Sequence, residues 1–148
     1  MKVTFREAHR DDVPAVVALL RDDVLGAGRE AEGIEPYQKA FDEMNHEGNN
    51  SLFVGEVGGQ VIATYQMTLI TGLSLKATRR AQMESIRIAD EYRGQGIGEL
   101  LMTDAEDRAR AGNAGLLQLT SNKQRSRAHS FYLGNGFVPS HEGFKKTL

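Results

Sequence analysis

Apolar residues recur at two different spacings along the chain, and each spacing predicts a different kind of element. Near the N-terminus they fall three or four positions apart, on one face of a helix that begins near Asp11 or Asp12 and has Pro14 in its first turn. The apolar positions of this helix are Val13, Val16, Val17, Leu20 and Val24.

Two segments in the middle of the chain predict an antiparallel hairpin. Within Gln60–Ile70 the residues alternate between two sets with a period of two, which is typical of a strand. Gly58-Gly59 separates this segment from a second apolar run, Ser51–Val57, and a two-glycine turn permits the positive φ angles of tight hairpins. We therefore expect the two runs to pair side by side.

The same criteria assign the remaining elements. Further strands are expected over residues 3–7, 80–89, 116–120, 137–141 and 144–148, further helices over 36–45, 98–111 and 126–133, and loops over 26–33 and 71–78. The buried stripe of the third helix is expected at Ile97, Leu100, Leu101, Ala105 and Ala109. This order, with one strand–helix–strand crossover near its end, predicts a mixed α/β (α+β) fold around a mostly antiparallel sheet.

Length and composition narrow the class of protein. The chain has 148 residues, without internal repeats or low-complexity segments, which predicts one domain over residues 1–148. Cysteine is absent, so disulfides, thiolate nucleophiles and cysteine-bound zinc are excluded. The four histidines have no metal-ligand spacing, and we expect no metal. The longest apolar run, Ala15–Leu20, is far shorter than the ~20 residues of a bilayer span, so we expect a cytoplasmic protein without a membrane partner.

The segment with the clearest chemistry is a glycine cluster between an expected strand and an expected helix. It contains Arg93 followed by glycines at positions 94, 96 and 98. Glycines let backbone N–H groups approach an anion, and the start of a helix adds unpaired N–H groups and a partial positive charge. The spacing fits neither the dinucleotide fingerprint nor a P-loop, which leaves an anion cradle or a ligand-free turn.

A resemblance favours the anion cradle. Residues 93–98, Arg-Gly-Gln-Gly-Ile-Gly, resemble the Arg/Gln-x-x-Gly-x-Gly/Ala signature of the GNAT superfamily of N-acetyltransferases. Residues 128–137, from Ala-His-Ser-Phe-Tyr to Gly-Phe, resemble the second motif of that superfamily, except that Arg125 stands where the family usually has Asn. The resemblance implies a GNAT-like fold, in which helices flank a mixed sheet and one pair of parallel strands splays apart.

The resemblance also implies acetyl-CoA as co-substrate. Its pyrophosphate would lie on the cradle, and its pantetheine arm would pair with the backbone of Ile86 and Ile88, whose side chains we expect in the core. Arg125 has two interpretations, a solvated surface residue or a contact to a cofactor phosphate. The expected cofactor-binding residues are Ile86, Ile88, Arg93, Gly94, Gln95, Gly96, Ile97, Gly98 and Arg125.

Two residues are candidates for proton transfer. An amine with a pKa of about 10.4 must lose a proton before it attacks a thioester. Strand alternation places Glu84 on the same face as Ile86 and Ile88, where a carboxylate either serves as the base or pairs with an arginine such as Arg87. Tyr132 falls on the tyrosine of the second motif; it either protonates the leaving thiolate or is a core aromatic.

These residues predict an N-acetyltransferase that acts by direct attack of a primary amine of a small molecule or amino acid. Two alternatives stay open: a non-catalytic acyl-CoA-binding module, and an acetyltransferase for an amine on a protein or tRNA. The formal net charge of −2 argues against nucleic acid as a partner. The sequence leaves a homodimer open and does not identify the acceptor amine.

Overall fold

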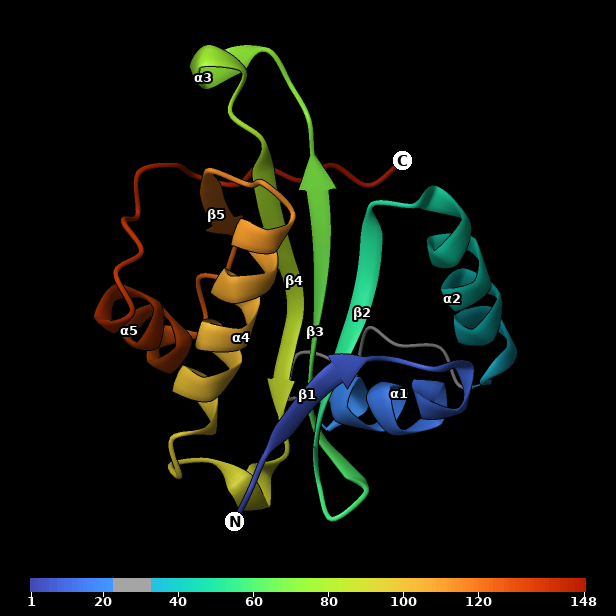
Figure 1. The fold of residues 1–148 in the computed structure, drawn as a ribbon. Helices are drawn as coiled ribbons and strands as arrows, with labels where there is room; N and C mark the ends of the chain where they lie inside the picture. Colours follow the sequence, from blue (N-terminus) through green and yellow to red (C-terminus); the bar gives the residue numbers. More distant parts are fainter. Residues whose placement is uncertain (23–32) are drawn as a thin grey trace.

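The computed structural model describes residues 1–22 and 33–148. Figure 1 shows helices on both sides of a central sheet. The strands are β1 (Thr4–Glu7), β2 (Asn50–Val57), β3 (Gln60–Ile70), β4 (Arg80–Ile88) and β5 (Leu116–Leu119). The helices are α1 (Val13–Arg21), α2 (Glu35–Glu47), α3 (Ser74–Ala77), α4 (Ile97–Ala111) and α5 (Ser126–Gly134).

The sheet has the strand order β1-β2-β3-β4-β5. The first four strands pair antiparallel, whereas β4 and β5 run parallel across the crossover helix α4. Their parallel pairing joins residues 80–83 of β4 to residues 116–119 of β5 and goes no further, although β4 continues to Ile88. The mixed, mostly antiparallel sheet with one parallel pair and flanking helices is therefore confirmed.

Each face of the sheet has its own apolar core. On one face α4 packs against side chains from β3 and β4, and Tyr65, Met83 and Leu101 are almost completely buried there. On the other face α1 and α2 cover the sheet, and their core contains Val17, Phe41 and other side chains. Figure 1 shows α4 and α5 on one side and α1 and α2 on the other.

The expected C-terminal strands are wrong. Residues 137–148 form neither helix nor strand, and their one backbone–backbone hydrogen bond within the segment joins the N–H of Ser140 to the oxygen of Val138. Alternating apolar residues predict a strand only where a neighbouring strand can pair with them, and this segment lacks such a ladder. Val138 and Phe144 consequently stay exposed.

Smaller differences concern individual helices. In α4 Leu100 is 50% exposed and Met102 is buried in its place, while the other four expected stripe residues are buried. In α1 the buried set includes Leu19. The expected loop over 71–78 contains α3, a single turn in which Leu75 and Lys76 have positive φ.

Val24 and all of the expected loop over 26–33 except Gly33 lie outside the described residues. None of the helices in the described part of the chain is long and apolar enough to cross a membrane.

Candidate active site

An irregularity in β4 determines where the candidate base lies. Glu84 pairs with Gln66 of β3, but the next pair joins Arg87 to Thr64, so three steps along β4 match two along β3. Ser85, in the middle, has a φ of 54°. This is a β-bulge, and it shifts the alternation of side chains by one residue.

Because of this bulge, the expected position of Glu84 on the same face as Ile86 and Ile88 is wrong. Glu84 shares a sheet face with its partner Gln66, on the side of α1 and α2, whereas Ile86 and Ile88 pack on the core under α4. The carboxylate is exposed, and within residues 1–22 and 33–148 it makes no ion pair. The salt-bridge interpretation of Glu84 therefore finds no support in the structure.

The end of β4 is where the sheet opens. Beyond Met83 the strand has no partner on the β5 side. The oxygen of Ile86 accepts a hydrogen bond from Nη1 of Arg87 at 2.9 Å, and the oxygen of Ile88 accepts one from Nε of Arg93 at 3.4 Å. Arginine side chains thus bond to the carbonyl groups that the sequence assigns to the pantetheine arm.

The glycine cluster forms an open helix N-terminus. Gly96 is the N-cap of α4 with a φ of 79°, and no side chain caps the helix. A Cβ atom at Gly94 or Gly96 would meet nothing within 4 Å. Unpaired N–H groups in open space at the positive end of a 15-residue helix are suited to bind an anion.

Two side chains of the loop stabilise this N-terminus. Gln95 Nε2 donates a hydrogen bond to the oxygen of Glu91 at 3.0 Å. Arg93, which holds Ile88, also pairs with Asp90 at 3.0 Å, and half of its side chain remains exposed. The guanidinium is thus held at the end of β4, in the loop that leads into α4, and its exposed half is available to a negative group.

The other two cradle residues face the protein interior. Ile97 is 1% exposed, and its side chain belongs to the core under α4. A Cβ at Gly98 would lie 2.9 Å from two ring carbons of Phe131, which shows that Gly98 is needed for the close approach of α5 to α4. This contact brings the two sequence motifs together in space.

Tyr132 lies in an aromatic cluster beside the splayed strands. Its ring packs edge to face against Phe131 and Phe137, with centroid distances of 5.6 and 5.8 Å. Burial raises the pKa of the phenol, while the positive charges of Arg125 and Arg87 act in the opposite direction. Arg125 is the N-cap residue of α5, and its charge acts at this hydroxyl. Tyr132 is thus protonated at neutral pH and is both a packed aromatic and a potential proton donor.

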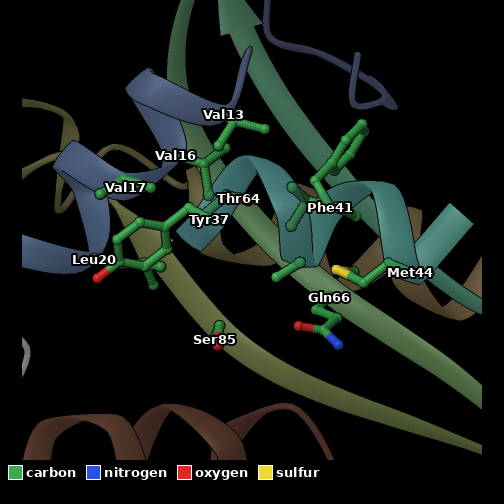
Figure 2. A pocket seen from close by; sticks show the side chains of 12 residues that line it. Val13, Val16, Val17, Leu20, Tyr37, Phe41, Met44, Thr64, Gln66 and Ser85 are labelled. Atoms are coloured by element: carbon green, nitrogen blue, oxygen red, sulfur yellow. The ribbon is translucent and has the colours of Figure 1, made fainter. Parts of the chain in front are cut away.

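A cavity of about 170 Å³ lies between α1, α2 and the sheet. Figure 2 shows apolar side chains from the two helices around it, with Gln66 and Ser85 on the strands below. Sequence reasoning missed both the cavity and Ser85. Helix periodicity identified four of the lining residues, Val13, Val16, Val17 and Leu20, but only as one apolar face of a helix, and nothing in the sequence around Ser85 signals a bulge.

The structure therefore brings together an anion-binding helix N-terminus, an opened strand and an apolar cavity. Glu84 projects from β4 on the cavity face, and Tyr132 packs with the core on the α4 face. The two candidate proton-transfer groups thus flank β4 from opposite faces of the sheet. Among the described residues no group of three His, Asp or Glu side chains is arranged to hold a metal ion.

Comparison with known proteins supports one family. The family model for acetyltransferases of the GNAT family matches residues 13–137. An aminoalkylphosphonate N-acetyltransferase of Salmonella typhimurium is 39% identical over 67 residues. That match spans 45% of this chain and 44% of the relative, so less than half of either protein.

Solved structures share the fold over the whole chain. A transcriptional regulator from Bacillus halodurans C-125 is 39% identical, with a TM-score of 0.94 over 99% of this chain and 100% of its own. A glucosamine-6-phosphate N-acetyltransferase from Arabidopsis thaliana, 16% identical, has a TM-score of 0.80 over 99% of both chains. A predicted acetyltransferase from Clostridium acetobutylicum, solved with acetyl-CoA and 18% identical, has a TM-score of 0.77 over 99% of this chain and 96% of its own.

Proposed function

This chain belongs to the GNAT family of acetyltransferases, and on that premise we propose that it transfers an acetyl group from acetyl-CoA to the primary amine of a small molecule. The observation that carries the proposal is the open N-terminus of α4 beside the splayed end of β4. Gly94 and Gly96 leave room for a phosphate there, and Arg93 supplies a positive charge.

The residues present fit acetyl-CoA. The first amides of α4 and Arg93 would hold the pyrophosphate, and Arg125 is a further cation for a phosphate group. The backbone of Ile86 and Ile88 would hold the pantetheine arm along the edge of β4 that β5 leaves open, after Arg87 and Arg93 release the carbonyl groups. When bound, acetyl-CoA supplies an acetyl group activated as a thioester.

The proposed mechanism is a direct transfer without a covalent enzyme intermediate. Glu84 accepts one proton of the substrate ammonium, directly or through a water, and the free amine forms the new C–N bond at the acetyl carbonyl carbon. The nitrogen, positively charged after the attack, releases a second proton to water. The C–S bond breaks, and the Tyr132 hydroxyl donates its proton to the departing thiolate and regains one from water. Glu84 reaches the amine from the face of α1 and α2, while Tyr132 serves the leaving group from the α4 side.

The test combines a turnover assay with a binding assay on the whole chain. A panel of primary amines is incubated with acetyl-CoA, and free thiol is measured against a control without enzyme. Coenzyme A at about 100 times its Kd should stabilise the protein by about 2.7 kcal/mol in a thermal unfolding experiment. Stabilisation without thiol release from any amine would indicate a binding module, and the absence of both would refute the proposal.

A further inference from the structure

The cavity under α1 and α2 has an unusual lining for a site that meets a charged substrate. Within residues 1–22 and 33–148, the twelve residues that line it are uncharged. The helices contribute apolar side chains, among them Val16, Leu20, Phe41 and Met44. An anionic group placed here would lose its hydration without gaining a cation, at a high free-energy cost.

Two of the three polar side chains that the strands contribute to the cavity already have partners. The Thr64 hydroxyl donates a hydrogen bond to the oxygen of Phe53 at 2.9 Å, and Gln66 Nε2 donates one to Asn50 Oδ1 at 2.8 Å. Because these donors already have acceptors, the sheet side offers few free hydrogen-bonding groups to a polar ligand. The cavity as a whole favours apolar atoms.

The size of the cavity indicates how large the apolar group is. An apolar protein cavity of about 150 Å³ holds one benzene molecule. The cavity here, about 170 Å³, therefore has room for a phenyl ring or a branched alkyl group of similar volume. The cavity is partly open, so the rest of the acceptor would extend out of it.

One end of the cavity meets the candidate base. Ser85, at the bulge, lines the cavity, and Figure 2 shows it on the strand below the apolar side chains. Glu84 is the next residue, and its cross-strand partner Gln66 also lines the cavity. An amine joined by a short link to a group in the cavity would thus have its nitrogen close to Glu84, whose negative charge attracts an ammonium.

We infer that the acceptor is a primary amine carrying a compact apolar group of about phenyl size, and that this group binds in the cavity between α1, α2 and β3. The inference rests on the proposed function, since it specifies the acceptor of the same reaction. It separates this chain from the Salmonella relative named for aminoalkylphosphonates, because a phosphonate would find no cation among the described residues that line the cavity.

The experiment compares three amines with acetyl-CoA by thiol release: benzylamine, methylamine and 2-aminoethylphosphonate. We expect kcat/KM for benzylamine to exceed that for 2-aminoethylphosphonate by about tenfold or more. One methylene more or less on a substrate group in a hydrophobic pocket already changes kcat/KM by roughly 10- to 200-fold. A preference for the phosphonate, or equal use of both, overturns the inference while leaving the proposed acetyl transfer intact.

A matched pair of variants tests the location. Ala40, an exposed residue of α2, lines the cavity, whereas Ala18, an exposed residue of α1, does not. Ala40→Phe should lower kcat/KM for benzylamine about tenfold and leave that for methylamine within about twofold, and Ala18→Phe should change neither. Equal losses for both amines in Ala40→Phe would show that the apolar group binds elsewhere.

A binding readout separates this inference from the catalytic proposal. Toluene, which carries the ring without the amine, should raise the melting temperature of the parent protein and of Ala18→Phe but not of Ala40→Phe. If toluene binds in this pattern and no amine is acetylated, the cavity assignment holds and the proposed reaction fails. If amines are acetylated and toluene has no effect in the parent, the cavity assignment fails.

Discussion

The phenol oxygen of Tyr65 lies 2.6 Å from Oδ2 of Asp104, and the two residues join the middle of the sheet to the middle of α4. Arg108 Nε donates a hydrogen bond to the same carboxylate oxygen at 2.8 Å, and its guanidinium lies over the ring of Phe53. Burial, together with the hydrogen bond to Asp104, raises the pKa of Tyr65. The phenol therefore stays protonated and keeps donating to Asp104 well above neutral pH.

Removal of this carboxylate should destabilise the fold. Asp104→Ala leaves the buried hydroxyl of Tyr65 and the guanidinium of Arg108 without their shared acceptor, and we expect a loss of about 3 kcal/mol in the free energy of unfolding. Tyr65→Phe leaves the Asp104–Arg108 pair intact and should cost about 1–2 kcal/mol. Urea unfolding gives both values.

A control for this pair is available on the same helix. The side chain of Asp107 is 73% exposed and lies 3.7 Å from Arg110, so Asp107→Ala should change the free energy of unfolding by less than about 0.5 kcal/mol. A loss in Asp104→Ala no larger than that in Asp107→Ala would show that the buried network adds no stability.

Local patterns in the sequence predict much of this fold. The Gly58-Gly59 turn fixes the hairpin of β2 and β3, and both glycines have positive φ as a tight turn requires. Four of the five expected stripe residues of α4 are buried, because a 3.6-residue period and one contact face are sufficient to identify them. The glycine cluster also begins a helix where the sequence places it.

Features that depend on distant partners could not be predicted. The position of Glu84 depends on the β-bulge at Ser85, which arises from the pairing with β3 and leaves no periodic signal. Short apolar segments at 137–141 and 144–148 suggest strands, but the structure gives them no pairing strand. Val16 and Phe41 follow helical periodicity as core residues, yet whether they close against the sheet or leave a cavity depends on packing volumes.

The cradle predicts a specific loss of cofactor affinity. Gly96→Asp places a carboxylate at the N-cap of α4, where it competes with a phosphate for the unpaired amides and repels it by charge. We expect the Kd for acetyl-CoA, measured by calorimetry, to rise about tenfold or more, equivalent to about 1.4 kcal/mol. The positive φ of Gly96 adds backbone strain of about 1–3 kcal/mol, but a Cβ at this position meets nothing within 4 Å, so we expect the variant to fold.

Gly48 supplies the matched control for this variant. Its φ of 82° is close to that of Gly96, and a Cβ there likewise meets nothing within 4 Å, but it lies at the C-terminus of α2. Gly48→Asp therefore introduces the same charge and the same backbone strain away from the cradle. An equal change of Kd in both variants would mean that the phosphates bind elsewhere.

The proposed base predicts a pH-dependent defect. Glu84→Gln keeps the shape of the side chain but cannot accept a proton at neutral pH, so kcat should fall, on the scale of about 10²- to 10⁴-fold. Because the free amine becomes more abundant as the pH rises toward about 10.4, kcat should recover partly in alkaline buffer. The measurement is kcat against pH with one amine substrate, together with the Kd for acetyl-CoA, which should be unchanged.

Glu142→Gln, an exposed site in the C-terminal segment, controls for the loss of one negative charge and should keep the parental pH profile. A parental kcat in Glu84→Gln would return Glu84 to the role of a surface carboxylate. A uniform loss without alkaline recovery would assign it to substrate positioning instead of proton transfer.

The proposed acid predicts a different profile. Tyr132→Phe removes only the hydroxyl and preserves the edge-to-face contacts with Phe131 and Phe137, so stability should change little. Without the hydroxyl, the departing thiolate has no proton donor, so kcat should fall at all pH values at which the parent tyrosine is protonated. Since burial raises the pKa of Tyr132, that range extends into alkaline buffer, and raising the pH supplies free amine but no proton donor for the thiolate.

The kcat of Tyr132→Phe should therefore stay low where that of Glu84→Gln recovers. Parallel pH profiles in the two variants would contradict the division of roles, and a parental kcat in Tyr132→Phe would leave Tyr132 as a core aromatic.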